Sequence, residues 1–288
     1  MESGLEKMLT KNNWITSNIY DRAFDKSVDF RVSLNPYEFK DINFIEASEY
    51  TCHEIYKDYQ NLYLALSGGM DSEYVLRAFY RAGISITPII VCCGNEKENQ
   101  YAYNVCNELQ IVPIVLKISE EDFLRKYYEI YSKINGVGYN TTQVLFAAEY
   151  AQNVDGMLIT GNHFIGDGDE LIADEHYATL NEWDFYTDFF SYKNIDFFLY
   201  TIEIAYSMMP RKYVKWNMYK HELYGIEYRN KEKAIYSLSA KQILQRMSSS
   251  LISKQHGCKW TKQKFLSIFE KYKIGDVYGT TNYDSHKR

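Results

Sequence analysis

The residues of this sequence best suited to chemistry are a short run of serines, glycines and an aspartate. Residues 67–72 read Ser-Gly-Gly-Met-Asp-Ser, follow the apolar run 62–66 and precede a helical pattern of apolar residues. A loop between a buried strand and a helix directs backbone N–H groups and the positive end of the helix dipole at one place. Glycine lets the backbone approach a ligand closely and adopt positive φ without strain. The run therefore predicts an anion site, usually for phosphate, made by Ser67, Gly68, Gly69, Met70, Asp71 and Ser72.

Asp71 is the unusual member of this loop, because a carboxylate repels an anion. It either caps the helix N-terminus or helps to hold a Mg²⁺ ion that bridges to the phosphates. The loop is not a Walker A loop, since no Gly-Lys-Ser/Thr follows at the required spacing. A Gly-Gly turn capped by serine and aspartate is the purely structural alternative.

A second polar segment follows the apolar run 157–160. Residues 161–171 hold three glycines, three acidic residues and one histidine. Carboxylates are hard oxygen ligands for Mg²⁺, and glycines permit the tight turns around it. Asp169 and Glu170 are the candidates for the metal or for recognition of a substrate amine, with a surface turn as the alternative. His163 is a candidate acid or base, although a lone histidine at a strand end is more often a hydrogen-bonded structural group.

Strand and helix patterns alternate through the middle of the chain and place both segments. The strand patterns cover 61–67, 86–93, 112–118 and 157–160; the helix patterns cover 71–82, 96–109, 120–133 and 141–152. This alternation predicts an α/β fold with a parallel sheet covered on both faces. Ligands of such sheets bind at the carboxyl ends of the strands, where both polar segments lie.

The rest of the chain divides into two further parts. Residues 1–60 form an N-terminal extension with strand patterns at 13–16 and 28–34 and a helix at 45–59, residues 61–175 form the α/β domain, and residues 176–288 form a mainly helical region. The helix patterns of this last region cover 183–190, 196–209, 240–253 and 262–272. Their many aromatic residues indicate a helical core.

The composition is that of a globular protein outside the membrane. Hydrophobic residues make up 46% of the 288 positions, and no apolar run is long enough to span a bilayer. Residues 1–7 lack the pattern of a signal peptide, and the five cysteines show no metal-type pairing. We therefore expect a cytoplasmic location with reduced thiols.

Charge is distributed unevenly along the chain. Residues 1–206 hold 15 Lys and Arg against 32 Asp and Glu, whereas residues 207–288 hold 17 against 6. The basic C-terminal third is a candidate seat for a polyanion, such as nucleic acid, pyrophosphate or an acidic partner. Compensation of charge within the molecule, with the basic third against the acidic body, is the alternative.

The run 67–72 resembles the SGGxDS signature of the PP-loop ATP pyrophosphatases, also called the adenine nucleotide alpha-hydrolase superfamily. The resemblance covers residues 60–170. Residues 166–171 are also similar to the G-[DE]-G-x-D-E-[LI] segment of asparagine synthetases, although residues 162–165 intervene after the strand and one residue before Asp169 is missing. The resemblance implies a doubly wound parallel sheet of the HUP/PP-loop type, with ATP and Mg²⁺ as cofactors, to which the helix patterns after residue 176 add a helical C-terminal region.

The resemblance also implies roles for individual residues. The loop 67–72 would hold the departing phosphates, Asp71 and Asp169 the metal, and Gly161 would complete the nucleotide site. The backbone of Val91 and Cys92 would read the adenine edge; thiol chemistry at Cys92 or Cys93 is the sharper alternative to an ordinary buried cysteine. A pyrophosphate leaving group needs positive charge, for which Arg211 and Lys215 are the candidates.

The activity that the resemblance implies is attack of a substrate oxygen on the α-phosphate of ATP, release of pyrophosphate, and displacement of AMP by a nucleophile. The leading interpretation is an asparagine-synthetase-like ligase acting on a small-molecule acceptor. Glutamine-hydrolysing members carry an N-terminal domain with cysteine at position 2; this chain has Glu2, and residues 1–60 are too few for that domain. A tRNA- or nucleobase-modifying enzyme and a non-catalytic nucleotide sensor are the alternatives. Residues 1–60 could serve as a dimerisation element or as a cover for the sheet.

Overall fold

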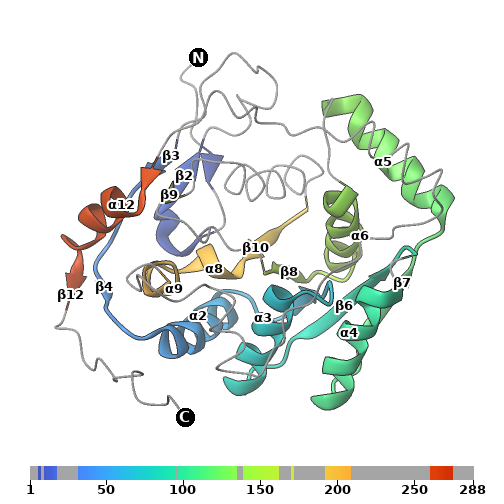
Figure 1. Ribbon diagram of the computed structural model, residues 1–288, viewed down its shortest axis with the longest axis horizontal. Helices are drawn as coiled ribbons and strands as arrows, with labels where there is room; N and C mark the ends of the chain where they lie inside the picture. Colours follow the sequence, from blue (N-terminus) through green and yellow to red (C-terminus); the bar gives the residue numbers. More distant parts are fainter. Residues whose placement is uncertain are drawn as a thin grey trace, which may run out of the picture.

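The computed structural model describes residues 6–7, 10–17, 32–94, 96–134, 139–161, 170–171, 192–208 and 260–274. Its centre is a parallel sheet of five strands in the order β10-β8-β5-β6-β7 (Figure 1). The strands are β5 (Leu62–Ala65), β6 (Thr87–Cys92), β7 (Ile114–Lys117), β8 (Met157–Thr160) and β10 (Asn194–Asp196). The predicted α/β fold with a parallel sheet is confirmed.

Helices cover both faces of this sheet, because successive residues of each strand point to opposite sides. On one face, α6 (Tyr139–Asn153) packs its alanines and Val144 against Ile89 and Leu158. On the other face, Leu62 and Leu64 belong to the larger core. The helices of that larger core include α2 (Phe44–Asp58), α3 (Met70–Arg81) and α4 (Glu96–Glu108). The sheet is therefore doubly wound, as expected.

Local sequence signals account for several helix ends. Helix α5 (Glu120–Ile134) begins after Ser119, whose hydroxyl accepts a hydrogen bond from the N–H of Asp122 at 3.0 Å, as expected of an N-cap. Helix α2 begins after Asn43, which caps the N–H groups of Ile45 and Glu46. Helix α3 is followed by Gly83 at φ +69°, the left-handed conformation in which glycine ends a helix.

The chain after residue 190 departs from the helix predicted over 196–209. Residues Asn194–Asp196 form β10 and pair with β8, and helices follow only as α8 (Phe197–Tyr200) and α9 (Ile202–Ser207), separated at Thr201. Every residue of this stretch is buried, so it shows neither the alternation of a strand nor the polar face of a helix. The helices predicted over 183–190 and 240–253 lie outside the described residues.

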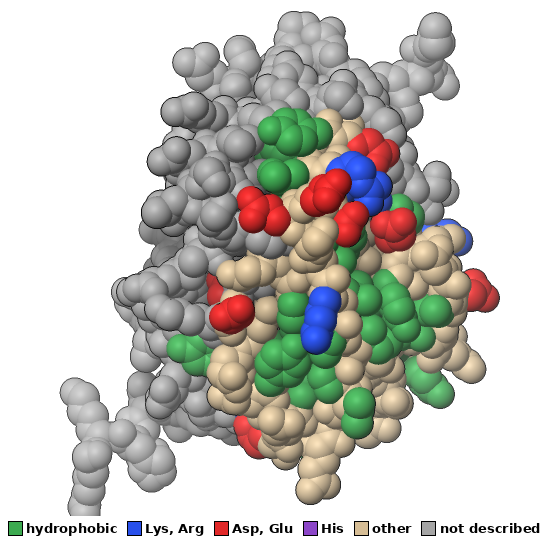
Figure 2. All heavy atoms as spheres, turned by 90° about the vertical axis from the view of Figure 1, so that its right-hand side faces the viewer, with side chains coloured by type: hydrophobic (Ala, Val, Ile, Leu, Met, Phe, Trp, Pro, Cys, Tyr) green, Lys and Arg blue, Asp and Glu red, His purple; other side chains and the backbone are tan. Residues whose placement is uncertain are grey.

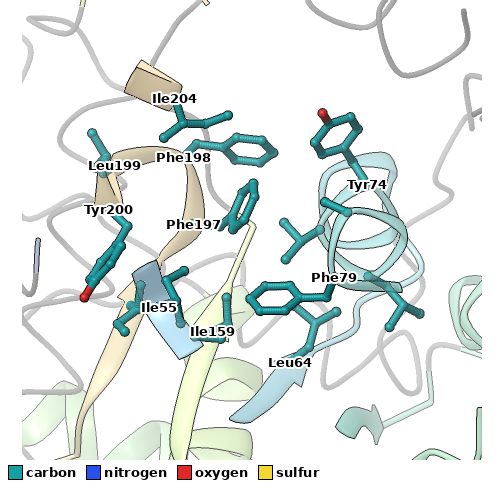
Figure 3. Packing of buried hydrophobic residues seen from close by; sticks show 14 of the residues in the cluster. Ile55, Leu64, Tyr74, Phe79, Ile159, Phe197, Phe198, Leu199, Tyr200 and Ile204 are labelled. Carbon is teal, nitrogen blue, oxygen red and sulfur yellow. The ribbon is translucent and has the colours of Figure 1, made fainter. Parts of the chain in front are cut away.

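Aromatic side chains form the centre of the larger core. Phe79 of α3 and Phe197 of α8 lie with ring centroids 6.0 Å apart, over Leu64 and Ile159 of the sheet (Figure 3). Phe197 also meets Phe198 edge to face at 5.1 Å. These aromatic residues were predicted to form a helical core; in the structure, Phe197 is buried between α3 and the sheet and attaches α8 to the sheet.

Outside the five-stranded sheet, short strands pair segments that lie before β5 or after β8. β1 (Glu6–Lys7), β2 (Ile15–Ser17) and β3 (Val32–Leu34) form an antiparallel sheet; β4 (Phe39–Lys40) pairs with β12 (Lys273–Ile274), and β9 (Glu170–Leu171) with β11 (Trp260–Thr261). A short 3-10 helix, η1 (Lys11–Asn13), precedes β2, and α12 (Lys262–Phe269) precedes β12. The strand patterns predicted at 13–16 and 28–34 overlap β2 and β3, and residues 28–31 lie outside the described part of the chain.

Trp14 joins these outer segments to the core. Its indole N–H donates to the carbonyl of Leu199 at 2.9 Å, and its ring meets Phe269 edge to face at 5.6 Å. The tryptophan is fully buried. The N-terminal segment, α8 and α12 therefore share one packed contact.

The side of the molecule that carries α4, β7 and α5 has a mixed surface. Figure 2 shows hydrophobic side chains gathered over its lower part and acidic side chains above them. Val112, just before the edge strand β7, is 85% exposed. Among the described residues, no helix is both long and apolar enough to cross a membrane.

Candidate functional site

The loop 67–72 connects β5 to α3 and is shaped by its own hydroxyl groups. Ser72 Oγ donates to the carbonyl of Gly69 at 3.1 Å and lies 3.2 Å from both the N–H and the hydroxyl of Ser67. Ser67 Oγ accepts from the N–H of Gly69 at 3.2 Å. Because a hydroxyl has one hydrogen to donate, that of Ser72 is committed to the loop backbone. Both serines therefore shape the loop in this arrangement.

Gly68 occupies a position that no other residue type could take without strain. Its φ of +72° is the left-handed conformation, and an added Cβ would lie 2.1 Å from the carbonyl oxygen of Glu98. The loop thus rests directly on the backbone of α4. This close approach is the reason for the first glycine of the pair.

Gly69 is the N-cap residue of α3 and has no side chain with which to cap the helix. Its carbonyl accepts from the N–H of Glu73 at 3.0 Å, the first bond of the helix. The remaining first-turn N–H groups lie at the positive end of the dipole of a 12-residue helix. Such a terminus attracts an anion.

Asp71 is the second residue of α3 and is partly buried. It does not occupy the N-cap position, which belongs to Gly69. Of its two predicted roles, capping at that position is therefore excluded by the geometry. Its carboxylate stands in the same first turn as the N–H groups of the loop.

Gly161, directly after β8, brings the second predicted segment to the first. An added Cβ would lie 3.0 Å from the carbonyl carbon of Asp71 and from the nitrogen of Ser72. β5 has β6 on one side and β8 on the other, so the loops after β5 and β8 meet where the strand order reverses. Open α/β sheets bind ligands at this switch point.

Val91 and Cys92 lie at the carboxyl end of the neighbouring strand β6. The carbonyl of Cys92 accepts from the N–H of Ile118 at 2.9 Å, so its backbone is already part of the sheet edge. The Cys92 thiol lies 3.3 Å from the phenol oxygen of Tyr103 on α4, and this hydrogen bond, with burial, raises the pKa of Tyr103 to about 12. The predicted adenine contact at these two residues stays a prediction.

Cys93 is buried and engaged by a residue that the sequence patterns did not single out. Gln143, in the first turns of α6, donates from Nε2 to Cys93 Sγ at 2.7 Å. Neither Gln143 nor Tyr103 stands in a recognisable motif, and only the strand order brings them to the end of β6. The two adjacent thiols thus have different hydrogen-bond partners.

Several predicted residues cannot be placed with this group. Asp169, His163, Arg211 and Lys215 lie outside the described residues, and Glu170 begins β9, opposite Thr261. Within the described part of the chain, no three His, Cys, Asp or Glu residues gather as a metal site. Of the two predicted metal ligands, the structure places only Asp71.

Comparisons with known proteins return structures alone. No family model and no curated protein matches the sequence. An NH3-dependent NAD synthetase from Campylobacter jejuni is 15% identical with a TM-score of 0.38, and covers 83% of this chain and 100% of its own. An NMN synthetase from Francisella tularensis is 16% identical with a TM-score of 0.34, and covers 72% of this chain and 94% of its own.

A third structure, described as a predicted subunit of a tRNA methyltransferase from Methanocaldococcus jannaschii, is 14% identical with a TM-score of 0.38. It covers 68% of this chain and 94% of its own. All three TM-scores lie below 0.5, so the fold rests on the sheet and loops of this chain itself. The sheet and the loops of this chain define a parallel α/β protein with a Ser-Gly-Gly-x-Asp-Ser loop at the switch point of the sheet.

Proposed function

We propose that this chain is an ATP-dependent enzyme of the PP-loop type, which transfers AMP to a substrate oxygen and releases pyrophosphate. The observation that carries the proposal is the position of the loop 67–72. It follows a central parallel strand, rests through Gly68 on α4, and meets Gly161 of the next loop at the switch point. A surface turn of the same sequence would not need either close approach.

The residues present fit ATP. The loop places backbone N–H groups at a helix N-terminus, where phosphates bind. Mg²⁺ in nucleotide sites is held by one or two carboxylates together with phosphate oxygens and water. Asp71 would supply one carboxylate, and Asp169 is proposed as the second. When bound, Mg²⁺ neutralises charge on the phosphates.

The proposed reaction has two steps. A carboxylate or other oxygen of the substrate attacks the α-phosphorus, the bond from that phosphorus to the bridging oxygen breaks, and pyrophosphate leaves. Ammonia or an amine then attacks the activated carbon, and AMP leaves. The loop N–H groups would stabilise the charge that develops on the leaving phosphates, with help from Arg211 or Lys215.

The cytoplasm is the proposed location of the protein.

The basic C-terminal third favours a second candidate, a tRNA- or nucleobase-modifying enzyme. Its 17 basic residues against 6 acidic ones would suit a polyanion. In that case the same first half-reaction would activate a base instead of a free carboxylate. A nucleotide sensor without ligase activity is the third candidate.

Pyrophosphate release separates these candidates. The purified chain is incubated with ATP and Mg²⁺ against a panel of carboxylates, amides and tRNA, each with and without ammonia. Pyrophosphate and AMP that depend on a carboxylate support the amide-forming ligase, and dependence on tRNA supports the second candidate. ADP and phosphate, or ATP binding without turnover on any substrate, would contradict adenylylation.

A further inference from the structure

A buried carboxylate lies in the first turn of α3, immediately after the loop 67–72. The backbone N–H of Glu73 donates to the carbonyl of Gly69, the N-cap residue of the helix, at 3.0 Å. The side chain of Glu73 is only 3% exposed. Four helical residues span about 6 Å along the helix axis, so this carboxylate belongs to the same turn as the N–H groups of the proposed phosphate site.

A negative charge at this position is unfavourable for the binding of phosphates. Asp71 stands in the same first turn, and there Mg²⁺ is proposed to offset the charge. Glu73 is buried, so its charge is screened far less by water and salt than that of an exposed residue. A buried charge needs a counter-charge within the protein.

Arg77, one turn further along α3, supplies the counter-charge. Its Nε and Nη2 atoms both lie 2.9 Å from Glu73 Oε1. The side chain of Arg77 is 14% exposed, so the pair is largely shielded from solvent. It therefore differs from the exposed pairs of helix surfaces, which contribute little because water and salt screen them.

Glu108 of α4 fixes the orientation of Arg77. The Nη1 and Nη2 atoms of Arg77 donate to the two carboxylate oxygens of Glu108 at 2.8 and 2.6 Å, the two parallel bonds of a guanidinium with a carboxylate. The loop rests on the same helix, because Gly68 meets the carbonyl of Glu98. Arg77 thus joins the helix that begins at the loop to the helix that supports the loop.

We propose that Arg77 is a positioning residue of the phosphate site, which acts by neutralising Glu73 behind the loop 67–72. It acts through Glu73 and not by contact with the nucleotide. The inference rests on the proposed binding of ATP at this loop. It adds the reason why phosphates would be accepted beside two carboxylates in one helical turn.

ATP titrations in the presence of Mg²⁺ into variants of the full chain test this role. Arg77→Met leaves the charge of Glu73 without its counter-charge, so ATP affinity should fall about tenfold, as for one charge at about 10 Å and an effective dielectric constant of about 20. In the double variant Glu73→Gln/Arg77→Met the opposing charge is absent, and the affinity should return to within about twofold of that of the unaltered chain. Arg81→Met is the matched control, because Arg81 lies in the last turn of the same helix in a half-exposed pair with Glu49.

The double variant separates neutralisation of charge from a merely structural role. If Arg77 only held α3 against α4, the double variant would bind ATP as weakly as Arg77→Met, and this result would overturn the proposal. An unchanged affinity in Arg77→Met, or an equal loss in Arg81→Met, would also overturn it.

The single variant Glu73→Gln decides if Arg77→Met does not fold. With Glu73 neutral and Arg77 still charged, ATP affinity should rise severalfold, and an equal or lower affinity would refute the proposal. Failure of the unaltered chain to bind ATP would be a different result, because it would refute the proposed function itself and the role of Arg77 with it.

Discussion

Gly68 and Gly83 share one backbone conformation, with φ of +72° and +69°, but not one environment. An added Cβ would lie 2.1 Å from the Glu98 oxygen at Gly68 and would meet nothing within 4 Å at Gly83. Alanine at either position costs about 1 kcal/mol for its left-handed φ. Only Gly68→Ala must also displace the loop or α4, so ATP affinity should fall at least about tenfold. Titration of ATP into both variants checks this, and normal binding by Gly68→Ala would contradict the proposed phosphate site.

The substitution Asp71→Asn tests whether the carboxylate of Asp71 holds Mg²⁺. It keeps the shape of the side chain and removes its charge, so the part of ATP affinity that depends on Mg²⁺ should fall, while binding without Mg²⁺ should not weaken. ATP titrations with Mg²⁺ and with EDTA measure the two parts. Asp122→Asn, in the exposed first turn of α5, is the control. An unchanged Mg²⁺ dependence in Asp71→Asn would show that this carboxylate does not hold the ion.

Glu203 gives the stability of the fold a pH dependence. Because burial raises the pKa of Glu203, the folded chain holds its proton at pH values where the unfolded chain has lost it. The resulting stabilisation is present below the unfolded pKa of about 4.3 and is lost as pH rises through the folded value. Glu203→Gln should therefore gain stability relative to the unaltered chain as pH rises. Urea unfolding at several pH values measures this gain; a constant difference would contradict it.

At the scale of the elements, two helices end on a residue that would be better as glycine. Gln110 after α4 and Asp155 after α6 have φ of 56° and 51°, and the residue after each donates back to the helix, Ile111 to Cys106 and Gly156 to Ala151. Aspartate tolerates this conformation better than glutamine. Gln110→Gly should stabilise by about 0.5–1 kcal/mol and Asp155→Gly by less. Urea unfolding measures the free energy of unfolding of both variants. A loss of stability in Gln110→Gly would contradict the left-handed conformation of residue 110.

The elements that the sequence predicted well are those with a local signal. The strand over 157–160 matches β8, and the helix over 120–133 matches α5, which Ser119 caps. β10 was missed because its three residues are too few to show a period. The contact of Gly161 with Asp71 could not be predicted in detail either. It requires β8 to lie beside β5, and strand order is not contained in any one segment.

At the scale of the whole molecule, Trp14 connects segments distant in sequence. Trp14→Phe would leave the buried carbonyl of Leu199 without its donor and a gap beside Phe269. We expect a loss of about 2–4 kcal/mol in the free energy of unfolding. Tyr80→Phe, at a position that is 56% exposed, should cost little. Equal stabilities of the two variants in urea would contradict a structural role for the indole.

The contacts of Trp14 also affect the order in which parts of the chain become fixed during synthesis. Trp14 leaves the ribosome before its two partners, since Leu199 and Phe269 follow 185 and 255 positions later. At about 5–20 residues per second, the tryptophan waits for roughly 10–50 s before its last partner exists. During that time the parallel strands can pair, but the indole has no completed pocket. The segment that holds Trp14 is therefore fixed only after Phe269 has been made, although it is synthesised long before that residue.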